Sequence, residues 1–356
     1  MAKILMKGNE ALAEAAIRAG VDGFFAYPIT PQNEVGEYIS AHLPKAGGVF
    51  IQAESEISAV NMVFGAAATG KRAMTSSSGP GLSLKQETLS SLAAAELPCV
   101  IANMSRGGPG LGNIAPAQGD YFQAVKGGGH GDYHLIVLSP STVQEMVDLT
   151  LGSFDLAEKW RLPVMILGDG ILGQMMEPVD FHDTKRPDPP KQPPAWAVGN
   201  YALDNQPRLV QSLHLQGDKL YQFSIQQKEK WDAIAREETR VEFIGFDQPD
   251  GVDYAFSSFG SSARIAKTAL KLAQKKGLKI GLIRPISLWP FPYAQIREKV
   301  SGLKGILNIE MNLGQMVEDI RLAVDGGVPV RHFPCPGGKV PTPEEILAEF
   351  ESLFLN

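Results

Sequence analysis

The feature that most constrains the fold is a repeated alternation of short β-rich runs with segments that have helical patterns. The β-rich runs in the first half of the chain are GFFAY (23–27), VFIQAE (49–54), AMTSSS (73–78), CVIANMS (99–105), LIVLSP (135–140) and VMILGD (164–169). This alternation predicts an α/β fold, a doubly wound parallel sheet with helices on both faces. Such sheets bind ligands beyond the carboxyl ends of their strands. The Pro-, Ser- and Gly-rich segments of this chain fall at those ends.

The alternation of strand and helix patterns stops after Gly170, and this change divides the chain. With 356 residues the chain is long for a single core, so two domains are expected. The proline-dense stretch 185–196 predicts an extended connector, and the polar stretch 221–243 predicts a surface helix. From Tyr254 the alternation returns and predicts a second, smaller α/β domain whose last helix begins at about Thr342. We therefore predict domains at 1–183 and 241–356, joined by a linker and surface helix at 184–240.

Composition excludes several classes of function. The formal net charge of −6 gives no reason to expect nucleic-acid binding. No run reaches the roughly 18 apolar residues that a membrane span needs, and the first residues do not resemble a secretory leader. We therefore expect a cytoplasmic protein without membrane contact. Cys99 and Cys335 lie far apart and cannot alone form a structural zinc site or ligate an iron–sulfur cluster. Any redox metal that serves this protein must then lie on another chain.

Two prolines bracket Ile29 and Thr30 in the segment GFFAYPITPQNEVGEYISAHL (23–43). Because proline suits the first position of a helix, the pattern predicts a helix from Pro31 with Thr30 as its N-cap. Such a cap stabilises a helix by about 1 kcal/mol. The same geometry places the Thr30 hydroxyl at an anion-binding helix N-terminus, where it can bind a substrate carboxylate. The local pattern leaves both interpretations open.

Acidic and small residues follow the next two predicted strands. Glu54 and Glu56 lie at the junction of a strand and a helix, where an acid either complements the helix dipole or shares a proton with a bound heterocycle. The turn TSSSGPGLS (75–83) is small, hydroxylated and glycine-rich, so a ligand or a partner subunit can approach its backbone closely.

Basic residues follow two further strands. Arg106 ends an apolar strand and is either a structural pair or a bidentate clamp for a carboxylate. The loop KGGGHGDYH (126–134) carries His130, Asp132 and His134, a set that more often forms a polar loop than a metal site. We therefore expect no metal ligated by this chain.

Three tempting signatures do not fit their structural context. GAAATGKR (65–72) has P-loop spacing, but Arg72 stands where a magnesium ligand should be, and the glycines continue a helical run. GPGLG (108–112) lacks the third glycine of a dinucleotide fingerprint. GDG (168–170) resembles the start of a thiamine magnesium motif, but the following proline-rich segment cannot complete it, and a simple strand end is favoured.

Five ordered motifs resemble those of one family, the alpha-type subunits of thiamine-diphosphate-dependent 2-oxoacid:ferredoxin oxidoreductases, and within it the 2-oxoisovalerate (branched-chain) group. The motifs are YPITP (27–31), QAESE (52–56), TSSSGPG (75–81), RGGPGLGN (106–113) and GGGHGDYH (127–134). The resemblance implies a first domain of the transketolase pyrimidine-binding type and a second domain like the transketolase C-terminal domain. It also implies CoA-dependent oxidative decarboxylation of a 2-oxoacid to acyl-CoA and CO2, with reduction of ferredoxin.

The resemblance further implies partners and cofactors. Thiamine diphosphate would lie between this chain and a beta subunit that carries the diphosphate and Mg2+. Iron–sulfur clusters would lie on one or more further subunits, and coenzyme A would be a substrate.

Site residues follow from the same resemblance. Glu56 would hydrogen-bond the aminopyrimidine of the cofactor and so promote removal of its C2 proton. Thr30 and Arg106 would bind the substrate carboxylate, which makes Thr30 both cap and ligand. Four further residues would contact the cofactor, namely Pro28, Ile29, Ser78 and Gly79. His130 would line the substrate pocket.

Three alternatives stay open. The substrate of the same reaction is 2-oxoglutarate if a second cation, from Lys126, His130 or His134, meets its distal carboxylate. A thiamine enzyme that decarboxylates or ligates without ferredoxin would also suit TSSSGPG, although such enzymes usually carry the magnesium motif on the same chain. A binding or regulatory subunit without chemistry is the third alternative, against which stands the presence of Thr30, Glu56 and Arg106 together.

Overall fold

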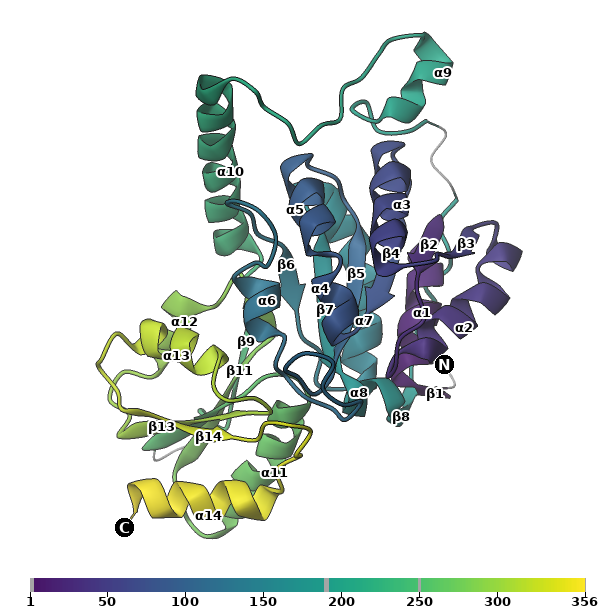
Figure 1. The fold of residues 1–356 in the computed structure, drawn as a ribbon. Coiled ribbons are helices and arrows are strands. Elements are labelled where there is room, and N and C mark those ends of the chain that lie inside the picture. Colours follow the sequence, from purple (N-terminus) through teal and green to yellow (C-terminus); the bar gives the residue numbers. More distant parts are fainter. Residues whose placement is uncertain (1–2, 189–191, 249–250, 356) are drawn as a thin grey trace.

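A seven-stranded sheet organises the first part of the computed structural model, which describes residues 3–188, 192–248 and 251–355 (Figure 1). The sheet has the order β12-β6-β7-β5-β4-β2-β3. Its strands are β2 (Gly23–Ala26), β3 (Val49–Gln52), β4 (Ala73–Ser77), β5 (Val100–Ser105), β6 (Ile136–Leu138), β7 (Val164–Asp169) and β12 (Ser287–Trp289). All pairs are parallel except β12 with β6. The central strands β4, β5 and β7 are buried throughout, as expected for parallel strands covered on both faces.

The helices of the first domain form two packing groups. Helix α1 packs against α2 and α7, whereas α3 packs against α5. The helices are α1 (Gly8–Arg18), α2 (Asn33–His42), α3 (Glu56–Ala68), α4 (Gly79–Ser83), α5 (Gln86–Ala94), α6 (Tyr121–Val125), α7 (Val143–Trp160) and α8 (Gly170–Gln174), with a 3-10 turn η1 (Pro44–Ala46). A small antiparallel ladder joins β1 (Ile4–Lys7) to β8 (Met176–Val179). The predicted α/β fold with a parallel sheet is confirmed.

The linker region contains the predicted surface helix, α10 (Gly217–Glu237), preceded by η2 (Val198–Asn200) and α9 (Tyr201–Asp204). Figure 1 shows α9 and the chain that leads to α10 standing away from the sheet. The proline-dense segment packs partly on the first domain, since Arg186 donates from Nη1 to the carbonyl oxygen of Val21 at 2.7 Å. Its residues 189–191 lie outside the described residues.

A five-stranded sheet of order β14-β13-β10-β11-β9 forms the second domain, with β9 antiparallel at one edge. Its strands are β9 (Val241–Ile244), β10 (Tyr254–Ser257), β11 (Ile280–Pro285), β13 (Gly305–Glu310) and β14 (Val330–Pro334). Its helices are α11 (Gly260–Lys275), α12 (Tyr293–Lys299), α13 (Met316–Val324) and α14 (Pro343–Phe354). Thr342 caps α14 in a capping box with Glu345, which agrees with the predicted start of the last helix.

One strand crosses the predicted domain boundary. β12 belongs to the 241–356 range in sequence, yet it pairs with β6 at the edge of the first sheet. Arg284, fully buried beside it, donates to Glu145 of α7 at 2.5 Å and to Glu242 of β9 at 2.9 Å. The two domains are therefore joined by a shared sheet edge and by ion pairs from the buried Arg284 to two partly exposed glutamates.

Among the described residues, none of the helices has both the length and the apolar content that a bilayer crossing requires. Cys99 and Cys335 are both buried and form no disulfide.

Candidate functional site

Thr30 lies in the turn between β2 and α2, but it does not cap the helix. The prediction of a helix from Pro31 with Thr30 as N-cap is wrong, because α2 begins at Asn33 and Gln32 occupies the N-cap position. The carbonyl oxygen of Pro31 accepts from Asn9 Nδ2 at 2.8 Å and from Gln174 Nε2 at 3.1 Å, so side chains of α1 and α8 replace an intrahelical bond. Thr30 is exposed, which leaves its hydroxyl accessible to a ligand.

Arg106 follows β5 directly and reaches across to the Thr30 turn. Its Nη1 donates to the carbonyl oxygen of Thr30 at 3.0 Å, and its Nη2 donates to that of Leu111 at 3.1 Å. The side chain is 8% exposed, and its Nε has no partner. The structure thus brings together Thr30 and Arg106, the two residues that the sequence resemblance assigns to a carboxylate.

Glu56 is the first residue of α3 and is 8% exposed. Ser55 caps this helix by accepting from the Ser58 backbone N–H at 3.2 Å, so the Glu56 carboxylate lies in the first turn, where the helix dipole favours a negative charge. The neighbouring Glu54 is exposed. Of the two glutamates that the sequence places at this junction, only Glu56 is buried.

Gly81 marks the point where Glu56, β4 and the Thr30 turn converge. A Cβ atom at Gly81 would lie 2.5 Å from Ser77 Oγ, 2.7 Å from Glu56 Oε1 and 3.1 Å from Ile29 Cδ1. Any side chain larger than hydrogen would therefore displace the carboxylate. The buried hydroxyls of Ser77 and Ser78 have no partner within the described part of the chain.

Gly79 begins the short helix α4 with a left-handed backbone (φ +40°), a conformation that favours glycine. A Cβ there would lie 3.4 Å from Arg106 Cγ, so the glycine turn and the arginine are in direct contact. Ile29 and Gly79 thus link the Glu56 cluster to Arg106. Pro28 lines a neighbouring pocket of about 330 Å³ together with Gln32, Gln52 and Ser76.

A cleft of about 550 Å³, here called the Arg106 cleft, opens between the two domains. The first domain lines it with Gly79, Pro80, Ser83, Arg106, Gly107, Gly108, Pro109, Gly110, Ala117, Gly119 and Asp120, and the second with Met311, Asn312, Leu313, Gln315, Pro336 and Gly337. Arg106 is the only cation among these lining residues. Burial raises the pKa of Asp120, and the hydrogen bond that its Oδ2 accepts from Asn103 Nδ2 at 3.1 Å opposes this effect.

The second-domain wall of this cleft was missed by sequence reasoning. Met311 and its neighbours follow the carboxyl end of β13, and Pro336 and Gly337 follow β14. The rule that ligands bind beyond the carboxyl ends of parallel strands would have found them, had it been applied to the second sheet as well. Gln118 anchors the wall, since its backbone N–H donates to Met311 O at 2.9 Å and its Nε2 to Phe259 O at 2.8 Å.

His130 lies apart from these groups. It is exposed in a loop whose Gly129 packs against Gln86 and Ser90 of α5, and it is not among the described residues that line the Arg106 cleft. Its role in substrate binding stays a prediction. Within the described ranges no group of three or more His, Cys, Asp or Glu residues has an arrangement that could hold a metal ion.

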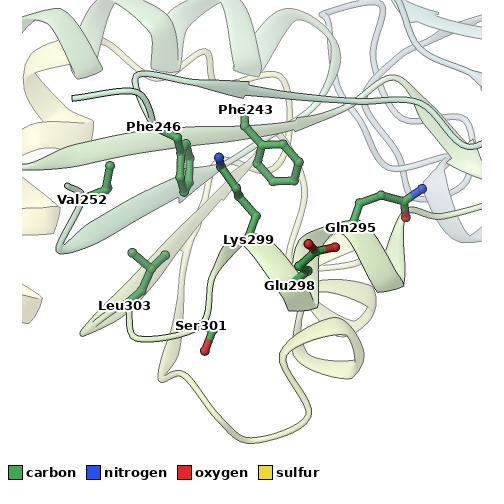
Figure 2. A pocket seen from close by; sticks show the side chains of 8 residues that line it. All are labelled: Phe243, Phe246, Val252, Gln295, Glu298, Lys299, Ser301 and Leu303. Atoms are coloured by element: carbon green, nitrogen blue, oxygen red, sulfur yellow. The ribbon is translucent and has the colours of Figure 1, made fainter. Parts of the chain in front are cut away.

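A further hollow of about 510 Å³ lies in the second domain and contains none of the predicted site residues. Figure 2 shows its lining, in which Lys299 lies between Phe243 and Phe246. The Lys299 ammonium is 6.0 and 5.7 Å from the two ring centroids, as in cation–π pairs. The lysine is thus engaged with the aromatic wall, and the convergent polar groups lie instead at the Arg106 cleft and around Gly81.

Comparison with protein families gives two adjacent matches. The family model described as "Pyruvate flavodoxin/ferredoxin oxidoreductase, thiamine diP-bdg" matches residues 14–242, and that of "Pyruvate:ferredoxin oxidoreductase core domain II" matches residues 252–346. Among curated proteins, the ketoisovalerate oxidoreductase subunit VorB of Methanothermobacter thermautotrophicus is 49% identical over 91% of this chain and 90% of its own length. The 2-oxoglutarate synthase subunit KorA of the same organism is 37% identical over 96% of each chain.

Two solved structures are similar in fold. The 2-oxoglutarate:ferredoxin oxidoreductase from Magnetococcus marinus, with 2-oxoglutarate, coenzyme A and succinyl-CoA bound, superposes with a TM-score of 0.86 at 30% identity. The match covers 98% of this chain and 65% of that one, so this chain spans less than two thirds of its length. A split-gene transketolase in an inactive beta4 tetramer has a TM-score of 0.58 at 12% identity over 98% of each chain, a likeness of fold alone.

Proposed function

Because this chain belongs to the alpha-type subunits of the 2-oxoacid:ferredoxin oxidoreductases, we propose that it catalyses, with partner subunits, the CoA-dependent oxidative decarboxylation of a branched-chain 2-oxoacid. Ferredoxin takes the electrons, and the products are acyl-CoA and CO2. The observation that carries the proposal is the convergence of Glu56, Arg106 and Thr30 at the sheet's carboxyl edge, in a chain 49% identical to a ketoisovalerate oxidoreductase subunit.

The residues around Gly81 fit the aminopyrimidine part of thiamine diphosphate. A buried carboxylate, two buried hydroxyls without partners and a glycine that leaves no room for a Cβ form a small polar recess at strand ends. Glu56, Ser78, Gly79, Pro28 and Ile29 would hold the cofactor there. When bound, thiamine diphosphate supplies the nucleophilic carbon that attacks the 2-oxo group and accepts the electrons released by decarboxylation.

The side chains of this subunit have distinct tasks. Glu56 holds or accepts a proton at the heterocycle, a task that suits a buried carboxylate at a helix N-terminus. Arg106 and the Thr30 hydroxyl bind the substrate carboxylate and so orient the bond that breaks. The Thr30 carbonyl oxygen fixes Arg106 at 3.0 Å, which makes the pair a single binding element.

The lining of the Arg106 cleft favours an aliphatic substrate over 2-oxoglutarate. A second carboxylate needs a second cation, and none of the three candidates, Lys126, His130 and His134, is among the described residues that line this cleft. Lys126 pairs with Asp319 at 2.6 Å, and burial lowers the pKa of His134 to about 4, so that this histidine is neutral at pH 7. Met311 and Leu313 provide apolar surface in the cleft.

We further propose the partners that the reaction requires. A beta subunit would carry the diphosphate and Mg2+ site, and iron–sulfur subunits would pass electrons to ferredoxin.

Cys99 and Cys335 are buried and unpaired, which suits the reducing cytoplasm.

The test is anaerobic viologen reduction by the complex purified with its native neighbours, with and without coenzyme A. Reduction that depends on coenzyme A and is fastest with 2-oxoisovalerate supports the proposal. Faster reduction with 2-oxoglutarate than with 2-oxoisovalerate would replace the substrate. No reduction by a complex that holds thiamine diphosphate and intact clusters would overturn the reaction itself, in favour of a ferredoxin-independent thiamine enzyme or a subunit without chemistry.

A further inference from the structure

Gln118, on the first domain, uses each of its polar atoms to hold the second domain. Its backbone N–H donates to the Met311 carbonyl oxygen at 2.9 Å, and its side-chain Oε1 accepts from the Met311 backbone N–H at 3.0 Å. Its carbonyl oxygen accepts from Asn312 Nδ2 at 2.9 Å. The amide Nε2 donates to the Phe259 carbonyl oxygen at 2.8 Å, and Oε1 also accepts from Ser262 Oγ at 2.7 Å. One residue therefore binds both the turn after β13 and the start of α11.

The surroundings of the Gln118 amide leave it little freedom. Gln118 is 4% exposed, so each hydrogen bond that it loses would leave a buried polar group without a partner. Gly260 lies against the amide with a left-handed backbone (φ +56°), and a Cβ atom there would be 2.9 Å from Gln118 Nε2. The backbone of the second domain thus approaches this side chain as closely as glycine allows.

Gln118 is also linked to Arg106 by a short stretch of backbone. Arg106 pairs with Pro116 in an isolated antiparallel bridge, and Gln118 follows Pro116 by two residues. The residues on either side of Gln118 line the Arg106 cleft, as does Met311 on the opposite wall. Gln118 therefore connects the arginine on one wall of the cleft to the backbone of the other wall.

The second-domain wall is itself a fixed unit. Glu310, the last residue of β13, is fully buried and accepts from the backbone N–H groups of Met316 and Val317, each at 2.9 Å. It also accepts from Asn312 Nδ2 at 2.8 Å. Because these bonds tie the turn 311–315 to its own domain, the position of the wall relative to Arg106 depends on the contacts that cross the cleft.

We propose that Gln118 is a positioning residue that sets the place of the second-domain wall relative to Arg106, and thereby which 2-oxoacid side chains the cleft accepts. The inference rests on the proposed function, in which Arg106 binds the substrate carboxylate. A 2-oxoacid fixed by its carboxylate extends a branched side chain further toward the wall than the methyl group of pyruvate. A rigid apolar wall discriminates by about 10- to 200-fold for each methylene group.

The experiment measures kcat and KM of the assembled complex for 2-oxoisovalerate and for pyruvate by anaerobic viologen reduction. Gln118→Met keeps the length of the side chain and both backbone bonds to the second domain, but removes the amide. We expect KM for 2-oxoisovalerate to rise by about 10-fold while kcat changes by less than about twofold. KM for pyruvate should stay unchanged, so the ratio of the two kcat/KM values falls by about 10-fold.

Ser261→Ala is the matched control for a general loss of domain contact. Ser261 Oγ donates to Asp169 Oδ1 at 2.9 Å, which is another buried bond between the two domains. Neither residue is among the described residues that line the Arg106 cleft. The control should lower the unfolding temperature but leave the substrate ratio at the wild-type value. Where Gln118→Met does not assemble, Gln118→Asn takes its place, because it keeps the amide but shortens its reach by one methylene group.

The outcomes separate this inference from the proposed function. An active wild-type complex whose substrate ratio is unchanged in the Gln118 variant overturns the inference alone. An equal change of the ratio in Ser261→Ala, or an equal loss of kcat for both substrates in the Gln118 variant, also overturns it, because either result indicates a general disturbance. A wild-type complex that reduces viologen with no 2-oxoacid overturns both.

Discussion

The Arg106 guanidinium and the Thr30 carbonyl oxygen lie 3.0 Å apart, which joins the end of β5 to the turn after β2. A second N–H donor of the same guanidinium fixes the Leu111 carbonyl oxygen at 3.1 Å. The planar guanidinium donates to both carbonyl oxygens at once, a geometry that a lysine ammonium does not reproduce.

Arg106→Lys should therefore keep the positive charge but lose the two simultaneous hydrogen bonds to the Thr30 and Leu111 carbonyl oxygens. We expect kcat/KM for the 2-oxoacid to fall by about 100-fold, because the side chain no longer holds the substrate carboxylate in a fixed position relative to the Thr30 turn. Steady-state viologen reduction measures this. Arg161→Lys is the control, since Arg161 contacts Glu96 and lies outside the cleft. Wild-type kinetics in Arg106→Lys would contradict the binding role.

Thr30→Val tests the hydroxyl alone. The substitution leaves the backbone carbonyl that Arg106 contacts and replaces only the hydroxyl of this exposed residue with a methyl group. Loss of one hydrogen bond to a carboxylate should lower kcat/KM by about 10-fold, mainly through a higher KM. Thr30→Ser should restore most of the activity. Equal kinetics for the valine and serine variants would show that the hydroxyl does not touch the substrate.

Glu56→Gln tests the proton transfer. The amide keeps the size of the buried side chain but cannot accept a proton, so turnover should fall by about 10² to 10⁴-fold. Glu54→Gln is the matched control two residues earlier, on an exposed side chain. Single-turnover kinetics of both complexes give the comparison. Parallel losses in the two variants would point to damage of the α3 N-terminus and not to chemistry.

Gly81→Ala should weaken cofactor binding. Its Cβ would lie 2.7 Å from Glu56 Oε1 and 2.5 Å from Ser77 Oγ, so these groups must move. Gly65→Ala, in the middle of α3, meets nothing within 4 Å and should be neutral or stabilising by about 0.5–1 kcal/mol. Thiamine diphosphate affinity and unfolding temperature are measured for both. Undiminished affinity in Gly81→Ala would contradict the recess described here.

Lys85 gives a pH signature in stability. Burial lowers its pKa from the ordinary 10.5 to about 7, so between these values the unfolded chain binds more protons than the folded one. Folding stability from this group therefore rises with pH from about 7 to about 10.5, by at most about 1.4 kcal/mol per pH unit. The unfolding temperature of the wild type, measured relative to that of Lys85→Met, should rise from pH 7 to pH 9. A difference that stays constant would contradict the lowered pKa.

Sequence reasoning succeeded where local pattern decides structure. The predicted β-rich runs became the central strands β4, β5 and β7, and Thr342 with Glu345 marked the last helix. Glu56, Arg106 and Thr30 were placed at strand ends, where the parallel sheet gathers them.

Sequence reasoning failed where distant parts of the chain decide the outcome. The start of α2 depends on Asn9 and Gln174, which bond the Pro31 carbonyl from elsewhere in the chain. The buried state of Lys85 could not be expected either, since lysine is almost never fully buried. Likewise, nothing local in Ser287–Trp289 indicates pairing with β6.

The pairing of β12 with β6 affects how the protein responds to cleavage of its chain. β12 covers the backbone edge of β6, and without it the first sheet would end in unpaired N–H and C=O groups. A protease cut between α9 and α10, in the exposed segment 205–215, would leave two fragments that each lack part of a shared sheet. The fragments should therefore remain associated as a noncovalent pair, and the first domain expressed alone should aggregate through its open edge.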